Sequence, residues 1–348
     1  MGATNYGTFQ PDELMPLIPS LFVGGNFLSM TFFPGVFEFT TEFVHFDRVL
    51  DDKRMAQLVA PLAPGQIQQP KGYRMETLVP ASIKPRNQIN PNEVMKRLAG
   101  EAIGGSMSTG ERAAAVRERY LIGHQLKIAR RKEWMASNIL RTGGVTLVGT
   151  QYPSSTISFG RMGSHTVALA GAARWGEAGV SPWDNVDSWI DIVGTDSGAA
   201  VDIVVMDRLA WLLFAADPKT EKSLDLTLGQ GGTTAMSLGF DATVPGSPVY
   251  KGRSGSTEFY VYNDNYEDDA GSPAKLIPDY TVLLGSRGGV GGSWLYGCVQ
   301  HGENNYEPGQ YFAHNWVDPD SGAELIETIT APICAPARTD ATMCVTVR

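Results

Sequence analysis

The chain has 348 residues, of which 43% are hydrophobic and 19% charged, and this composition excludes an intrinsically disordered protein. Its formal net charge is -9, because 37 acidic residues outnumber 28 basic ones, and proteins that grip phosphate backbones are usually basic. The 39 Gly and 21 Pro residues predict many turns. We therefore expect a β-rich rather than all-helical protein that does not bind nucleic acid tightly.

The segment 14–33 is apolar, but Pro16 and Pro19 and a pair of glycines interrupt it. No Lys or Arg precedes Arg48, so the basic region of a signal peptide is missing. The interruptions also leave no continuous apolar span for a bilayer. We expect this segment to be an arm that lies on a protein surface.

Two extended segments follow, at residues 36–50 and 73–83, with a Pro- and Gly-rich stretch between them. The first is rich in Phe, Val and Thr, which is typical of a strand. A lone two-stranded ribbon is only marginally stable in water. A long ribbon is therefore expected to lie on a neighbouring chain, and this suggests a polymer.

The clearest predicted element is a helix of about 50 Å, at the 1.5 Å rise of each helical residue. Ser108 and Glu111 have the spacing of a capping box, and Gly143 and Gly144 supply the stop. Basic residues outnumber acidic ones along it. These bases form either a solvated face or a basic spine that meets acidic surfaces of sister subunits.

Shorter elements follow without a regular βαβ repeat, which indicates an α+β protein. Helices are predicted at 181–193, where Pro182 suits the first turn, and at 208–216. Strands are predicted at 145–149, 156–159, 201–206, 258–262, 281–284, 294–300 and 324–330.

The search for chemistry finds no candidate catalytic, cofactor or metal site. The five histidines are scattered without metal-ligand spacing on one element, and the three cysteines form no Cys-x-x-Cys pair. Cys298 and His301 have no third ligand near them in the sequence. The glycine run 285–292 lacks the Gly-Lys-Ser/Thr ending of a phosphate loop and is expected to be a flexible loop.

Several short stretches, in the same order along the chain, resemble the major head protein of phage lambda and its relatives. They are Phe39-Thr40-Thr41-Glu42, Ile83-Lys84-Pro85-Arg86-Asn87-Gln88-Ile89-Asn90-Pro91, the strand 201–207 followed by Trp211, Tyr296-Gly297-Cys298-Val299-Gln300, Asn315-Trp316-Val317 and Ala331-Pro332.

This resemblance implies the α+β, Hong Kong 97-like phage capsid fold. The implied parts are an N-terminal arm (1–34), an extended β-hairpin loop (35–90), a peripheral domain with the long spine helix (91–179), an axial domain (180–311) and C-terminal strands that return to the peripheral domain (312–348). The implied function is that of a major capsid protein that self-assembles as hexamers and pentamers into the icosahedral head enclosing the double-stranded DNA of a tailed phage.

The resemblance also implies partners and a location. The expected partners are a portal protein and a separate scaffolding protein, and a decoration protein is left open. DNA is enclosed without sequence-specific binding, and no membrane is involved. Assembly is expected in the bacterial host cytoplasm, and the mature protein in the virion.

The residues expected to matter are contacts between subunits. Phe37, Phe39 and Phe43 lie at the root of the extended loop, and Lys84, Arg86 and Asn90 lie where it returns. Ordinary core packing for the phenylalanines, and solvated surface for the two cations, remain open. Two other functions also remain open: the shell of a cellular encapsulin-type nanocompartment, and an α+β enzyme with an unrecognised site.

Overall fold

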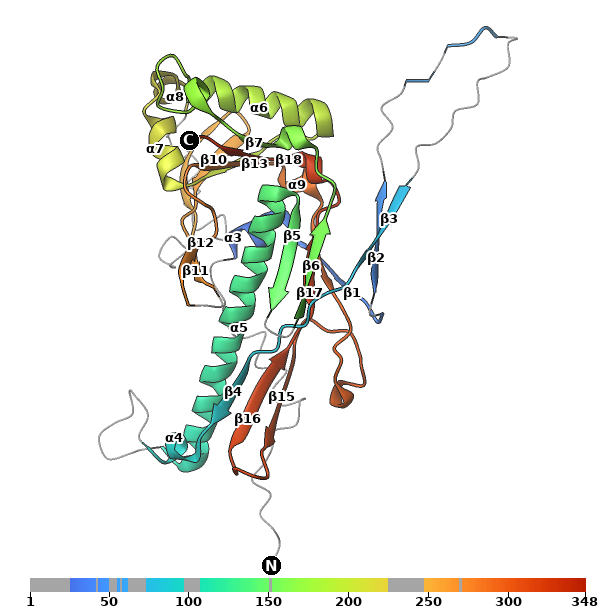
Figure 1. The fold of residues 1–348 in the computed structure, drawn as a ribbon, viewed down its shortest axis with the longest axis vertical. Helices are drawn as coiled ribbons and strands as arrows, with labels where there is room; N and C mark the ends of the chain where they lie inside the picture. The colour runs from blue at the N-terminus through green and yellow to red at the C-terminus, as the bar shows by residue number, and fades with distance from the viewer. Residues whose placement is uncertain are drawn as a thin grey trace, which may run out of the picture.

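The computed structural model describes residues 26–41, 43–49, 55–56, 58–61, 73–96, 107–149, 152–224, 247–268 and 271–348. They form an elongated molecule in which a long helix, α5 (Thr109–Thr142), runs from a small sheet at one end to a larger sheet at the other (Figure 1). None of the described helices combines the length and the hydropathy that crossing a membrane requires.

Helix α5 is the predicted spine helix, and the sequence signals at both of its ends are confirmed. The Glu111 amide donates to the Ser108 hydroxyl (3.3 Å), and the Ser108 amide donates to the Glu111 carboxylate (2.7 Å), which completes the capping box. Gly143 ends the helix in the left-handed region, at φ 73°, and a Cβ there would lie 2.4 Å from the Cβ of Arg161. Glycine is therefore required at this position.

The large sheet has the strand order β7-β18-β13-β8-β10-β9 in the described part of the chain. Its strands are β7 (Thr166–Ala168), β8 (Ile203–Met206), β9 (Val249–Ser254), β10 (Thr257–Val261), β13 (Thr281–Gly285) and β18 (Thr342–Thr346). Every residue of β8 is buried, as is typical of a strand in the interior of a sheet.

Three helices lie at the same end of the molecule as the large sheet (Figure 1). They are α6 (Pro182–Ser197), α7 (Arg208–Ala215) and α8 (Pro218–Ser223). The helices predicted at 181–193 and 208–216 are confirmed as α6 and α7. Pro182 occupies the first turn of α6, and the Asp207 carboxylate caps α7 by accepting from the Leu209 amide.

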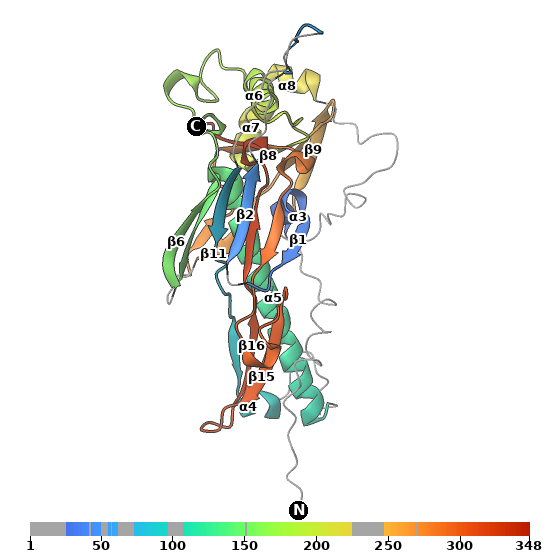
Figure 2. The same cartoon turned by 90° about the vertical axis from the view of Figure 1, so that its right-hand side faces the viewer.

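The small sheet packs beside the N-terminal half of α5 and has the order β15-β16-β4 among the described residues (Figure 2). Its strands are β4 (Arg86–Ile89), β15 (Phe312–Val317) and β16 (Glu324–Ile329), and the short helix α4 (Pro91–Met95) follows β4. A cluster of five buried side chains joins sheet and helix: Ile89, Val116, Leu121, Ala313 and Ile326.

The strand predicted at 36–50 is wrong in one respect, because it is two strands with different partners. Strand β1 (Gly35–Glu38) runs parallel to β14 (Ser293–Tyr296), which in turn pairs with β17 (Pro332–Ala335). Strand β2 (Val44–Val49) runs antiparallel to β3 (Tyr73–Leu78). Between β1 and β2 the chain leaves the body, and the β2–β3 ribbon projects from it (Figure 1).

The end of the apolar arm packs into this subunit's own core, so the expectation of an arm lying on a surface is wrong for residues 27–33. Helix α3 (Phe27–Phe32) and Phe33 bury their aromatic rings in the main apolar core. The glycine run 285–292, expected to be a flexible loop, contains the short helix α9 (Arg287–Val290). A Cβ on Gly292 would lie 2.3 Å from the Phe32 carbonyl oxygen, so glycine permits this close approach. The remainder of the arm, residues 1–25, is outside the described residues.

The other described elements are β5 (Gly144–Gly149) with β6 (Tyr152–Ser158), β11 (Asn265–Glu267) with β12 (Pro273–Lys275), and the 3₁₀ turns η1 (Gly163–His165), η2 (Gly171–Ala173), η4 (Gly302–Asn304) and η5 (Thr339–Ala341). The strand predicted at 145–149 is confirmed. The proposed division into domains stays a prediction; the last strand, β18, lies in the large sheet, whereas β15 and β16 lie beside β4.

Candidate functional site

The loop root, which we define as residues 36–43, holds the three phenylalanines singled out from the sequence. Phe37 is 56% exposed although it lies in β1, and Phe43 is 48% exposed just before β2. Phe39 is half-buried against the main core, and its amide donates to the Tyr296 carbonyl (2.9 Å). Phe39 therefore belongs partly to the core of this subunit, whereas much of the apolar surface of Phe37 and Phe43 is left uncovered.

The loop return, which we define as residues 83–90, holds Lys84, Arg86 and Asn90. Lys84 and Arg86 are exposed, and Nη2 of Arg86 lies 3.0 Å from Oε1 of Glu327, with its guanidinium over the ring of Trp316. Asn90 is the N-cap residue of α4, and its carbonyl accepts from the Glu93 amide. Arg86 is therefore held in place by its own subunit, and Lys84 is free of hydrogen bonds within the described residues.

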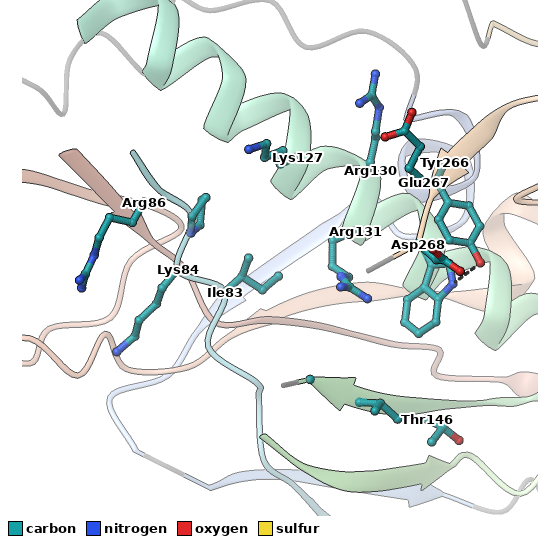
Figure 3. A pocket seen from close by; sticks show the side chains of 14 residues that line it. Ile83, Lys84, Arg86, Lys127, Arg130, Arg131, Thr146, Tyr266, Glu267 and Asp268 are labelled. Carbon is teal, nitrogen blue, oxygen red and sulfur yellow. Dashed lines mark hydrogen bonds between the residues drawn. The ribbon is translucent and has the colours of Figure 1, made fainter. Parts of the chain in front are cut away.

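A groove of about 890 Å³ joins the loop return to the spine helix (Figure 3). We call it the basic groove, because its lining includes five cations and two carboxylates: Lys84, Arg86, Lys127, Arg130, Arg131, Glu267 and Asp268. Its floor includes Trp134, whose indole N–H donates to the Tyr266 hydroxyl (3.2 Å) and whose ring lies under Arg131. The groove presents a net positive, partly aromatic surface on an acidic protein.

Some basic residues of α5 have partners within the subunit and others are exposed, and their contact with sister subunits stays a prediction. Arg117 makes a bidentate pair with Glu324 (2.6 and 2.8 Å), and Lys132 donates to the Tyr296 hydroxyl (2.9 Å). Lys127 and Arg130 are exposed and line the basic groove. Sequence reasoning found the bases but missed the groove, because its walls come from four separate segments of the chain.

Glu133 anchors helix α3 to the spine helix. It is buried, and its two carboxylate oxygens accept from the amides of Leu28 (2.7 Å) and Ser29 (2.9 Å) and from the Tyr262 hydroxyl (3.0 Å). The N-cap residue Asn26 makes no side-chain cap, so Glu133 takes that role from 105 residues away. Burial raises the pKa of Glu133 to about 7, against the opposing effect of these hydrogen bonds.

His124 connects the spine helix to the small sheet at the loop return. Its ring is buried, with Nδ1 3.0 Å from the Thr328 hydroxyl in β16 and Nε2 2.9 Å from the Asn87 side-chain oxygen in β4. Burial, together with the charge of Lys127, lowers the pKa of His124 to about 4. The neutral ring thus sets the position of β4, which carries Arg86, against α5.

Comparison with known proteins agrees with this architecture. Residues 12–347 match the family described as Phage major capsid protein E. The major capsid protein of Escherichia phage lambda is 25% identical over 316 residues, covering 89% of this chain and 90% of the relative, and that of Enterobacteria phage phi80 is 26% identical over 293 residues, covering 82% and 83%.

Solved structures show the same fold. A prophage capsid protein from E. coli CFT073 aligns with a TM-score of 0.76 and 20% identity, covering 98% of this chain and all of the other. An encapsulin complex from Synechococcus elongatus aligns with a TM-score of 0.50 and 11% identity, covering 93% and 88%. The chain has the α+β, Hong Kong 97-like capsid fold, and it belongs to the phage major capsid protein E family, as a lambda-like member.

Proposed function

We propose that this chain is the shell subunit of a tailed-phage head, and that it assembles as hexamers and pentamers into an icosahedral container for double-stranded DNA. Membership of a capsid protein family supports a shell-forming role. The observation that carries the proposal is the uncovered apolar surface at the loop root and along the loop.

That apolar surface is larger than one subunit needs to expose. Val36, Phe37 and Phe43 at the root are each 46–56% exposed, and Met55, Leu58 and Val59 farther along the loop are also exposed. Single exposed apolar residues are normal, but a run of them on a projecting segment marks a contact surface. Full burial of one such side chain contributes roughly 1.5–3 kcal/mol. Each subunit would gain this several times over in a closed lattice.

The basic groove is the proposed receptor for an acidic segment of another subunit. The side chains of Lys84 and Arg130 line it and make no hydrogen bond among the described residues. Acidic residues outnumber basic ones by nine in the whole chain, so a second copy of the chain supplies the complementary charge. Charge pairing of this kind sets the register between subunits more than it sets their affinity.

The remaining partners follow from the same proposal. A portal protein would occupy one vertex, a separate scaffolding protein would guide assembly in the host cytoplasm, and a decoration protein stays open. The acidic net charge suits a wall that encloses DNA without binding it tightly. In this proposal the chain has no catalytic residue and no cofactor.

An encapsulin-type nanocompartment is the second candidate, because one encapsulin complex shares the fold at a TM-score of 0.50. The relatives detected by sequence over most of the chain are named major capsid proteins of phages. A container for a genome is therefore favoured over a container for an enzyme.

Negative-stain electron microscopy of the purified chain, expressed with and without its neighbouring genes, tests the proposal. We expect closed shells, or free hexamers and pentamers. In the double variant Phe37→Ser, Phe43→Ser we expect the loss of shells while circular dichroism shows an unchanged fold, because both side chains are already exposed in the subunit.

The matched control is Leu212→Ser, which removes an apolar side chain that is 54% exposed on α7. This variant should assemble like the parent chain. A parent chain that stays monomeric or dimeric under both expression conditions would overturn the shell proposal. A double variant that assembles normally would remove the loop root from it.

A further inference from the structure

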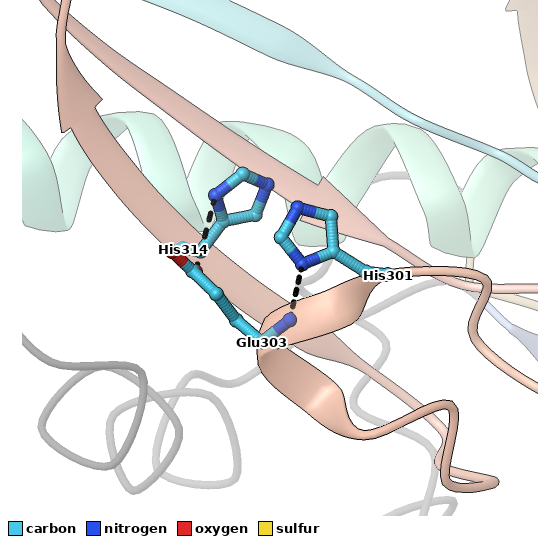
Figure 4. Close-up of side chains that lie close together, drawn as sticks. All are labelled: His301, Glu303 and His314. Atoms are coloured by element: carbon cyan, nitrogen blue, oxygen red, sulfur yellow. Dashed lines mark hydrogen bonds and ion pairs between the residues drawn. The ribbon is translucent and has the colours of Figure 1, made fainter.

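The loop between β14 and β15, residues 297–311, folds back so that two histidines and a glutamate meet. His301, Glu303 and His314 each offer a ligand atom, and these atoms all lie within 4.8 Å of one another. Figure 4 shows the rings of His301 and His314 facing each other and the Glu303 carboxylate beside His314. The sequence did not predict this group, because the loop brings His301 and His314 together from opposite ends of a 13-residue separation.

Neighbouring groups orient the two histidine rings. Nε2 of His314 lies 3.1 Å from Oε2 of Glu327, which leaves Nδ1 facing the Glu303 carboxylate at 3.9 Å, too far for a hydrogen bond. Nδ1 of His301 accepts from the Glu303 amide (3.3 Å), and its Nε2 has no hydrogen-bond partner among the described residues. A carboxylate behind a histidine, with the other ring nitrogen aimed into a hollow, is the usual support of a metal-binding imidazole.

Burial and access also fit a bound ion. The His314 side chain is only 7% exposed, whereas that of Glu303 is 60% exposed and belongs to the short turn η4, so it can move toward an ion. The three residues line a hollow of about 430 Å³ together with Trp316 and Lys84. Two ligands of a tetrahedral zinc ion lie roughly 3.4 Å apart, so the 3.9 Å between His314 and Glu303 needs to contract by about half an ångström, and a pair at the 4.8 Å limit of the group by about 1.4 Å.

We propose that His301, Glu303 and His314 bind a divalent cation of the zinc class and that this ion ties the 297–311 loop to strand β15. Two imidazole nitrogens and one carboxylate oxygen are a ligand set that zinc takes, and water completes the coordination. Glu327 supports the site without binding the ion, because its oxygens are occupied by Arg86 and His314. The ion lies beside Lys84 and Arg86, so it also stiffens the loop return.

Without an ion, the same residues would form only an aromatic ladder. The rings of Phe312, His314 and Trp316 stack along one face of β15, and His301 packs on two of them. A ladder needs neither the Glu303 carboxylate nor a free nitrogen on His301. Metal binding therefore distinguishes the two arrangements.

The test is equilibrium dialysis of the tag-free chain against zinc chloride, in whichever assembly state it purifies, followed by elemental analysis. We expect one tightly bound zinc per chain, and at least tenfold weaker binding in each of His301→Ala and Glu303→Gln. Both side chains are accessible, so these variants should fold; the buried His314 is left intact for that reason. Bound Co²⁺ should show the intense visible absorption of a tetrahedral site in the parent chain and not in these two variants.

Glu307→Gln is the matched control, because Glu307 is an exposed glutamate of the same loop and outside the cluster. It should bind zinc like the parent chain. Absence of stoichiometric zinc in the parent chain, or equal binding by the parent and the two variants, would overturn the proposal. Neither outcome bears on shell formation, so the two proposals fail separately.

Discussion

The two halves of the spine helix are attached to the molecule in different ways. The N-terminal half meets the small sheet through a five-residue apolar cluster and polar links, which include the Arg117–Glu324 pair and the hydrogen bonds of His124. The C-terminal half enters the main core, where Met135, Ile139 and Leu140 pack with residues of α3 and the large sheet. The N-terminal half, which we call the polar half, thus combines a small apolar cluster with polar links. The attachment of the C-terminal half is mainly apolar.

The two attachments differ in how readily they can rearrange. An apolar core depends on close packing over many neighbours, whereas hydrogen-bonded side chains near a surface exchange partners at small cost. The basic groove takes its α5 residues from the C-terminal half, from Lys127 onward, whereas the loop return lies on the polar half, where Asn87 meets His124. We therefore expect changes between assembly states to be absorbed there, while the attachment to the large sheet stays unchanged.

The largest expected effect is on the free energy of unfolding, and it differs between two buried aliphatic side chains of equal size, Ile139 and Leu121. We expect Ile139→Ala to lower the free energy of unfolding by about 3–5 kcal/mol and Leu121→Ala by about 2–3 kcal/mol, because the small cluster can collapse around its cavity and the main core cannot. Chemical denaturation of the unassembled subunit measures both. Ile192→Ala, at an exposed isoleucine of α6, is the control and should cost little. Equal losses at Ile139 and Leu121 would contradict the comparison.

A second prediction concerns the pH dependence that Glu133 contributes. Its pKa is about 7 in the folded chain against an ordinary value of 4.5, so the folded state binds more protons between these values. The contribution of Glu133 is therefore fully present below about pH 4.5 and is lost as the pH rises toward 7, on the order of 2–3 kcal/mol. Glu133→Gln should remove this slope and also weaken the cap on α3.

The measurement is the melting temperature of parent and variant subunits between pH 4.5 and 8. The difference between the two curves isolates Glu133 from the other groups that titrate in this range. Glu118→Gln, at an exposed glutamate of the same helix, should follow the parent curve. A Glu133→Gln curve parallel to that of the parent would show that the carboxylate does not titrate in this window.

The smallest expected effect has the opposite sign and belongs to the polar half. The pKa of His124 is about 4 in the folded chain against 6.5, so the unfolded state binds more protons between these values. Its contribution is present above about pH 6.5 and declines as the pH falls, by roughly 1–2 kcal/mol at pH 5. The melting temperature of the His124→Gln variant should lack this decrease between pH 7 and pH 5. Hydrogen exchange should place the acid loosening in β4 and β16, and loosening at α3 instead would contradict the assignment.

Local sequence signals determined several elements of the fold. The capping box at Ser108 and the glycine at Gly143 act on neighbouring backbone groups, so α5 was predictable at both ends. The strand 201–206 and the helix after Asp207 were also predictable, because a run of β-branched residues and a cap need no distant partner. The phage-capsid resemblance lay in short motifs, and the family match over residues 12–347 confirms the family that they indicated.

Only the tertiary structure decided what depends on distant partners. The break between β1 and β2 arises because β1 pairs with β14, and the burial of Phe27 and Phe32 depends on a core that closes around them. Glu133 reaches amides 105 residues away, and the histidine–glutamate group forms only when the 297–311 loop folds onto β15. No local preference encodes such contacts, because the free energy that forms them comes from burial and hydrogen bonding between segments that the sequence keeps apart.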